Sequence, residues 1–255
     1  MLPPTQRFST RVENYVKYRP HYPDSLIELL RKECGLPATS EWKIADIGSG
    51  TGISSELLLA NGNTVYGVEP NLEMRLAGEV YLKSFPKFHS IDGTAEATTL
   101  PDKSVDMILA GQAFHWFDQT LSKQEFRRIL KPAGKIVLLW NERAVKTTPF
   151  LTEYERMLQD YCPEYHLVDH RQIDRDIIAK FFAPHGFSDW VLPNAHIHDY
   201  DGISGRLLSS SYAPNTENPL YEPMMNELRR IFGMYNSGGT VTIDYATKVY
   251  IGTIE

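Results

Sequence analysis

The sequence has few cysteines, no run of basic residues and no long apolar segment. Cys34 and Cys162 are the only two cysteines, and they form no C-x-x-C pair, so neither a zinc site nor a disulfide framework is expected. No apolar stretch approaches the roughly 18 residues that a membrane span needs. The formal net charge is −6, which argues against nucleic acid as the main partner. We therefore expect no metal, nucleic-acid or membrane partner.

The remaining composition is that of an ordinary globular protein, with 42% hydrophobic and 23% charged residues. A chain of 255 residues can bury a substantial core as one large α/β domain or two small ones. Residues 1–7 are too polar for a signal peptide. Because no linker or repeat divides the chain, we expect a single domain. We also expect a cytoplasmic protein that is a monomer or a homodimer.

Apolar strands alternate with helices over the first part of the chain. Strands are predicted at 43–47, 64–68, 88–91, 105–110 and 135–140, with helices at 24–31, 54–60, 71–82 and 119–130 between or before them. This alternation predicts a parallel sheet that carries helices on both faces. Later in the chain, helices are predicted at 150–161, 174–182 and 222–235, a strand within 189–200 and a final strand at 240–252.

A glycine-rich loop follows the first predicted strand, with Asp46 before it and glycines at 48, 50 and 52. Glycines let the backbone approach a ligand closely, and the helix that follows directs free N–H groups at the same place. A dinucleotide fingerprint would need its third glycine at position 53, where Ile53 stands. The acid at the head of the loop favours a cofactor with a positive charge, because a carboxylate can hold an ammonium group directly or through water.

The second predicted strand also ends in an acid, Glu69. An acid at this place can accept hydrogen bonds from both hydroxyl groups of an unphosphorylated ribose. Glu69 alone would serve NAD equally well, so a nicotinamide-dependent oxidoreductase is an alternative. The glycine spacing favours the cationic cofactor instead.

Seven ordered segments resemble the class I S-adenosylmethionine-dependent methyltransferases, specifically the type 11 family of small-molecule enzymes. They are residues 15–23, 44–52, 68–74, 92–96, 100–106, 113–117 and 128–135. Several ordered segments are far more specific than a glycine loop alone. The resemblance implies a Rossmann-like α/β fold with a mostly parallel seven-stranded sheet, an antiparallel C-terminal strand and helices on both faces.

The resemblance also implies where the cofactor and the methyl acceptor bind. The implied cofactor residues for S-adenosylmethionine are Tyr18, Arg19, Asp46, Gly48, Ser49, Gly50, Thr51, Gly52, Glu69, Pro70, Asn71, Met74, Gly93, Thr94, Ala95, Glu96, Gln112 and Ala113. The expected substrate residues are Tyr22, His115, Trp116, Trp140, Arg143 and Tyr212. His115 is also a candidate catalytic base, and Arg143 could hold a substrate carboxylate with two hydrogen bonds.

Four parts of the single domain follow from this reading. Residues 1–23 are expected to form a lid over the cofactor, 40–142 the cofactor-binding core, 145–235 a cover over the substrate, and 240–252 the final strand. The expected function is methyl transfer to a small molecule. Because similar enzymes methylate small acids such as trans-aconitate, the acceptor atom could be a carboxylate oxygen. A non-catalytic S-adenosylmethionine-binding protein is a further alternative.

Overall fold

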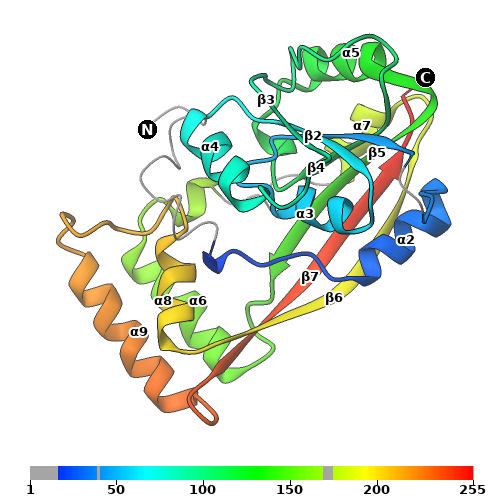
Figure 1. Cartoon of the computed structure of the whole chain (residues 1–255). Coiled ribbons are helices and arrows are strands. Elements are labelled where there is room, and N and C mark those ends of the chain that lie inside the picture. The colour runs from blue at the N-terminus through cyan, green and yellow to red at the C-terminus, as the bar shows by residue number, and fades with distance from the viewer. Residues whose placement is uncertain (1–16, 39–40, 169–174, 255) are drawn as a thin grey trace.

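A seven-stranded sheet with the strand order β3-β2-β1-β4-β5-β7-β6 forms the centre of the protein (Figure 1). The computed structural model describes residues 17–38, 41–168 and 175–254. The strands are β1 (Lys43–Ile47), β2 (Thr64–Val68), β3 (Phe88–Ile91), β4 (Val105–Gly111), β5 (Leu130–Arg143), β6 (Phe187–His198) and β7 (Val241–Gly252). β1 to β5 pair in parallel, and β7 runs antiparallel to both β5 and β6. The predicted sheet, with its antiparallel C-terminal strand, is confirmed.

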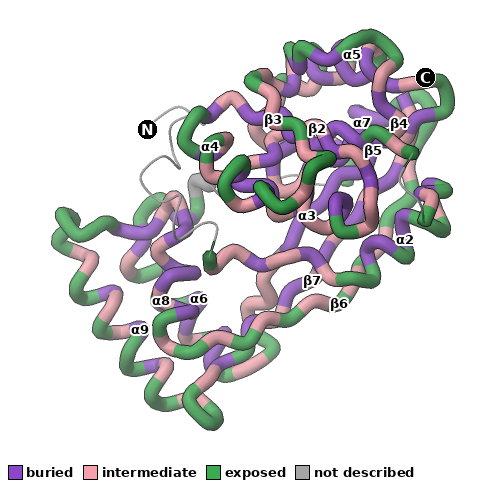
Figure 2. Tube along the Cα trace, in the orientation of Figure 1, coloured by how far each residue is buried: buried purple, intermediate pink, exposed green. Residues whose placement is uncertain are grey.

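Helices cover both faces of the sheet because its central strands are apolar on both sides. Leu139 faces one cluster of buried residues, which α2 (Ser25–Cys34) and α3 (Ile53–Ala60) complete. Leu138 faces the opposite cluster, which α5 (Gln119–Ile129) and α7 (Arg175–Phe182) complete. Figure 2 shows that buried residues run along the central strands.

A third apolar cluster lies beyond the parallel part of the sheet, around the first half of β7. It is built by α6 (Pro149–Tyr161), α8 (Tyr200–Leu208) and α9 (Tyr221–Tyr235), which stand together at one end of the long antiparallel pair β6–β7 (Figure 1). β6 and β7 are both 12 residues long, so they connect the sheet with this helical group.

The remaining elements are α4 (Leu72–Tyr81), which follows β2, and two short 3-10 helices, η2 (Phe114–Trp116) and η3 (Tyr165–Val168). Most of the expected lid, residues 1–16, lies outside the described residues. None of the helices in the described ranges combines the length and the apolar character needed to cross a membrane.

Candidate functional site

Two cavities adjoin at the carboxyl ends of β1, β2 and β4, which is where open parallel sheets bind ligands. Cavity A has a volume of about 180 Å³ and cavity B of about 150 Å³. Both are lined by Gly48, Gly111, Gln112 and Trp116, which therefore form the junction between them. Cavity A is otherwise lined by Gly50, Glu69, Pro70, Asn71, Met74, Thr94, Ala95, Glu96, Ala113 and Phe117.

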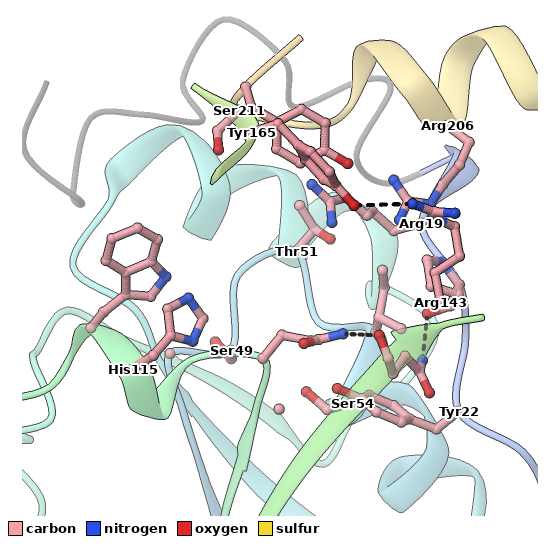
Figure 3. Close-up of a pocket in the computed structure, with 18 of the residues that line it drawn as sticks. Arg19, Tyr22, Ser49, Thr51, Ser54, His115, Arg143, Tyr165, Arg206 and Ser211 are labelled. Carbon is pink, nitrogen blue, oxygen red and sulfur yellow. Dashed lines mark hydrogen bonds between the residues drawn. The ribbon is translucent and has the colours of Figure 1, made fainter. Parts of the chain in front are cut away.

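Cavity B lies between the sheet and the group of helices α6, α8 and α9. Apart from the junction, its walls are Arg19, Pro20, Tyr22, Ser49, Thr51, Ile53, Ser54, His115, Asn141, Arg143, Val145, Tyr165, Arg206, Ser211 and Tyr212. In the described chain these wall residues include three arginines and no aspartate or glutamate. Figure 3 shows Arg19, Arg143 and Arg206 gathered on one side of cavity B, with His115 on the other.

The glycine loop is held in a conformation that few other residues could adopt. Gly48 and Gly50 have φ angles of +69° and +57°, in the left-handed region that favours glycine. A Cβ atom on Gly48 would lie 2.6 Å from the Cβ of Ala113. The backbone N–H groups of Gly48 and Ser49 donate to the Val68 carbonyl at 2.8 and 3.2 Å. The loop therefore presents bare backbone at the junction of the two cavities.

The Glu69 carboxylate lies in the wall of cavity A and is fixed by two backbone hydrogen bonds. Gly50 N donates to Oε2 at 3.0 Å, and Asn71 N donates to Oε1 at 2.9 Å. Burial raises the pKa of Glu69, while these two hydrogen bonds work against that rise. Each carboxylate oxygen can accept more than one hydrogen bond. Glu69 can therefore still receive two ligand hydroxyl groups.

Asp46 lies behind the wall of cavity B and not in it, and its expected contact with the cofactor stays a prediction. Its Oδ2 accepts hydrogen bonds from Ser54 Oγ at 2.7 Å and Ser55 Oγ at 2.6 Å, and the side chain is fully buried. Oδ1 has no hydrogen-bond partner among the described residues. Burial raises the pKa of Asp46 to about 6, against the effect of the two serine hydroxyl groups. Asp46 meets cavity B only through Ser54, which lines it.

Arg143, at the end of β5, donates three hydrogen bonds to other groups of the protein. It forms an ion pair with Glu155 of α6, and its Nη2 also donates to the Tyr165 hydroxyl at 3.1 Å. Its Nη1 donates to the Ala144 carbonyl at 3.3 Å. Arg143 lines cavity B as expected, but its charge is already neutralised by an acid.

Arg206, on α8, lacks such a partner, and sequence reasoning missed it. The side chain is 8% exposed; its Nε donates to Tyr245 Oη at 3.1 Å and its Nη1 to Ser210 Oγ at 3.0 Å. None of the described residues forms an ion pair with it. The available signal was an arginine beside Leu207, within a helix whose buried positions are otherwise apolar or small.

Asn141 was also missed, although it forms hydrogen bonds with three segments around cavity B. Its Nδ2 donates to the His21 carbonyl at 3.2 Å, and its Oδ1 accepts from Thr247 Oγ1 at 2.5 Å. Gln112 Nε2 donates to the Asn141 carbonyl at 3.1 Å, and Gln112 has a φ of +57° that non-glycine residues rarely adopt. Residues 19–22 are thereby fastened over cavity B beside the junction.

Most of the predicted site residues line one of the two cavities. Cavity A contains Gly48, Gly50, Glu69, Pro70, Asn71, Met74, Thr94, Ala95, Glu96, Gln112 and Ala113. Cavity B contains Arg19, Tyr22, Ser49, Thr51, His115, Trp116, Arg143 and Tyr212. Their contacts with ligands stay predictions.

Four other predicted residues lie outside both cavities, besides Asp46. Trp140 is 3% exposed and packs edge-on against the rings of Phe114 and Tyr250 on the opposite face of the sheet. Gly52 precedes α3, where a Cβ atom would lie 2.5 Å from Leu82 Cδ1. The remaining two are Gly93, packed against the Ala97 and Thr98 carbonyls, and Tyr18, whose ring lies against Gly205.

Residues 45–138 match the Methyltransf_11 family, described as a methyltransferase domain. Residues 45–138 form a methyltransferase domain of this family. The chain is 33% identical over 153 residues to an uncharacterised methyltransferase of Schizosaccharomyces pombe, covering 60% of this chain and 59% of that protein. The chain thus matches little more than half the length of this curated relative.

Two solved structures are similar to the methyltransferase domain in fold. A protein of Anaeromyxobacter dehalogenans described as a type II methyltransferase has a TM-score of 0.61 at 23% identity, covering 93% of this chain and 98% of its own. Geranyl diphosphate C-methyltransferase of Streptomyces coelicolor, solved with S-adenosyl-L-homocysteine, has a TM-score of 0.50 at 15% identity, covering 90% and 76%. Both likenesses support the Rossmann-like class I fold.

Proposed function

We propose that the chain transfers a methyl group from S-adenosylmethionine to a carboxylate oxygen of a small acid bound in cavity B. The observation that carries the proposal is the charge of this cavity, whose described walls hold three arginines and no acid, although Arg143 is paired with Glu155 behind the wall. Guanidinium groups bind carboxylates with paired, charge-assisted hydrogen bonds. A volume of about 150 Å³ suits a small molecule.

The residues at the junction and in cavity A fit S-adenosylmethionine. Gly48 and Gly50 line cavity A without side chains, and Glu69 offers its carboxylate to the ribose hydroxyl groups. The Streptomyces enzyme of similar fold binds the demethylated cofactor, which supports the same use here. When bound, S-adenosylmethionine supplies an activated methyl group on a positively charged sulfur.

The protein's own contribution is alignment and exclusion of water. One lone pair of the acceptor oxygen forms the new bond to the methyl carbon as the carbon–sulfur bond breaks, and the electron pair of that bond stays on sulfur. A carboxylate has no proton to lose, so the step needs no general base. Cavity B is closed, on the side of α6, α8 and α9, by residues 19–22 and 206–212. The base role of His115 stays a prediction that applies only to acceptors with a proton to remove.

The test is incubation of the protein and S-adenosylmethionine with panels of small carboxylic acids, phenols and amines, followed by mass spectrometry. We expect at least one acid to gain a methyl group that mild alkaline hydrolysis releases as methanol. Methylation of phenols or amines alone would overturn the choice of acceptor. Cofactor binding without transfer to any panel would favour a non-catalytic binding protein.

A further inference from the structure

Arg206 is a buried positive charge with no ion-pair partner among the residues that the structure describes. We infer that Arg206 determines acceptor specificity by binding a second carboxylate of the acceptor, one that is not methylated. This inference rests on the proposed methyl transfer but concerns a different part of the molecule. It makes the acceptor an acid with two separate polar ends.

The surroundings of Arg206 show why a ligand charge is needed there. Its neighbours Ile203 and Leu207 on α8 are fully buried. Its Nε and Nη1 donate to the hydroxyl groups of Tyr245 and Ser210, which leaves further guanidinium N–H donors for a ligand. A buried charge without a counter-charge is costly. A carboxylate from a ligand would satisfy both the charge and the remaining donors.

The other arginines of cavity B are engaged differently. Arg143 is neutralised by Glu155, and Arg19 Nη2 donates to the Ser209 carbonyl at 2.9 Å. Burial, together with the positive charge of Arg206, lowers the pKa of His198 to about 4, so this neighbour stays neutral near pH 7. Arg206 therefore keeps its positive charge without an acidic partner among the described residues, with Tyr212 and Ser211 beside it in the wall.

A carboxylate held by Arg206 is a poor methyl acceptor for two reasons. Its lone pairs are engaged by N–H donors, and its charge is neutralised, so its nucleophilicity falls. Arg206 also lies on the far side of cavity B from His115, whose neighbour Trp116 belongs to the junction with cavity A (Figure 3). The reacting group must approach that junction, so anchor and nucleophile are different groups of one acceptor.

The experiment is calorimetric titration of the full chain, saturated with S-adenosylhomocysteine, with dicarboxylates from malonate to adipate and with citrate. We expect at least one of these acids to bind. Arg206→Lys and Arg206→Gln should each weaken that binding at least tenfold, while the dissociation constant of S-adenosylhomocysteine stays within twofold. Arg156→Lys, at an exposed position on α6, is the matched control and should bind like the wild type. Unchanged acid binding in the folded Arg206 variants would overturn the inference.

A second measurement needs no variant and applies if the Arg206 variants fail to fold. The wild-type complex is titrated with the best-binding acid, its monomethyl ester and its dimethyl ester. The monomethyl ester retains the anchoring carboxylate and should still bind, whereas the dimethyl ester should not. Equal binding of all three, or no binding of any acid, contradicts an anchoring carboxylate.

These titrations separate the two proposals. Acid binding that depends on Arg206, without any methyl transfer, refutes the proposed function and leaves the anion site standing. Methyl transfer that does not change in the Arg206 variants refutes the anion site at Arg206 and leaves the proposed function standing. For an active acceptor, Arg206→Lys should raise KM at least tenfold with a smaller change in kcat, a split that a general loss of structure would not produce.

Discussion

The carboxylate of Glu69 accepts a hydrogen bond from the backbone N–H of Gly50 at 3.0 Å. The acid at the end of β2 thereby fixes the glycine loop that follows β1. One side chain thus orders the loop and faces cavity A, so the two features that indicated a cofactor are physically coupled.

Glu69→Gln should weaken S-adenosylhomocysteine binding by about tenfold to a hundredfold. The amide loses charge-assisted hydrogen bonds that contribute about 1.5–3 kcal/mol each. Calorimetric titration measures the change, and Glu79→Gln, at an exposed position on the adjacent α4, should have no effect. Equal affinities for Glu69→Gln and the control would show that Glu69 does not hold the ribose.

Gly48→Ala should lower both stability and cofactor affinity. The added Cβ atom would lie 2.6 Å from Ala113 Cβ, at a φ of +69°, and such crowding typically costs about 1–3 kcal/mol. Gly186→Ala is the matched control, because Gly186 has a φ of +79° and open space around it. It should lose about 1 kcal/mol of stability without a change in S-adenosylhomocysteine binding. If both variants affect binding alike, general strain is responsible.

Asp46→Asn should remove a pH dependence of stability. The pKa of Asp46 is raised from 3.8 to about 6 in the folded state, so its contribution is present below pH ~4 and is lost as pH rises through 6. The loss amounts to about 3 kcal/mol. Urea unfolding between pH 4 and pH 7 should show the wild type losing this much relative to Asp46→Asn. Parallel curves for the two proteins would contradict a raised pKa.

Arg143 and Glu155 should be strongly coupled in stability. Both side chains are largely buried, at 10% and 12% exposure, and removing one partner of a buried pair typically costs about 3–5 kcal/mol. Glu155→Gln and Arg143→Met should each destabilise the protein, and the double variant should lose clearly less than the sum. The free energy of unfolding in urea gives the cycle. Additive effects would mean that the two charges do not depend on each other.

His115→Asn should reduce kcat less than tenfold if the acceptor is a carboxylate, because no proton is removed. General acid–base catalysis contributes about 10²–10⁴-fold where it operates. The pH profile of kcat measured with the identified acceptor makes the distinction. A loss in that larger range, together with the disappearance of a limb near the pKa of histidine, would make His115 the base and exclude an acceptor without a proton.

The half of the fold that contains cavity A could be predicted from the sequence because it depends on short local patterns of residues. The strands at 43–47, 64–68 and 88–91 were predicted at the bounds that the structure has. It was harder to predict which residues of β5 face the cavity and which face the opposite side of the sheet. Trp140 was chosen at the end of β5, but Asn141 and Arg143 line cavity B while Trp140 faces the opposite cluster. A strand buried on both faces carries no alternation from which the cavity side could be inferred.

The acceptor half depends on contacts between segments that are distant in sequence. Arg206 is important because Tyr245, 39 residues later, binds its Nε, and because no acid among the described residues pairs with it. Arg143 was a reasonable choice as an isolated arginine, but its partner Glu155 comes from another helix. Asp46 was predicted from its place before the glycine loop, but its direct partners Ser54 and Ser55 come from the packing of α3.

Calorimetric titration of S-adenosylhomocysteine into the wild-type protein tests the central claim most directly. Cavities A and B with their shared glycine loop predict one binding site per chain, with an affinity that is weakened in Glu69→Gln and Gly48→Ala. No detectable binding at millimolar ligand, or a preference for NADH in the same experiment, would contradict the assignment of these cavities to methyl transfer.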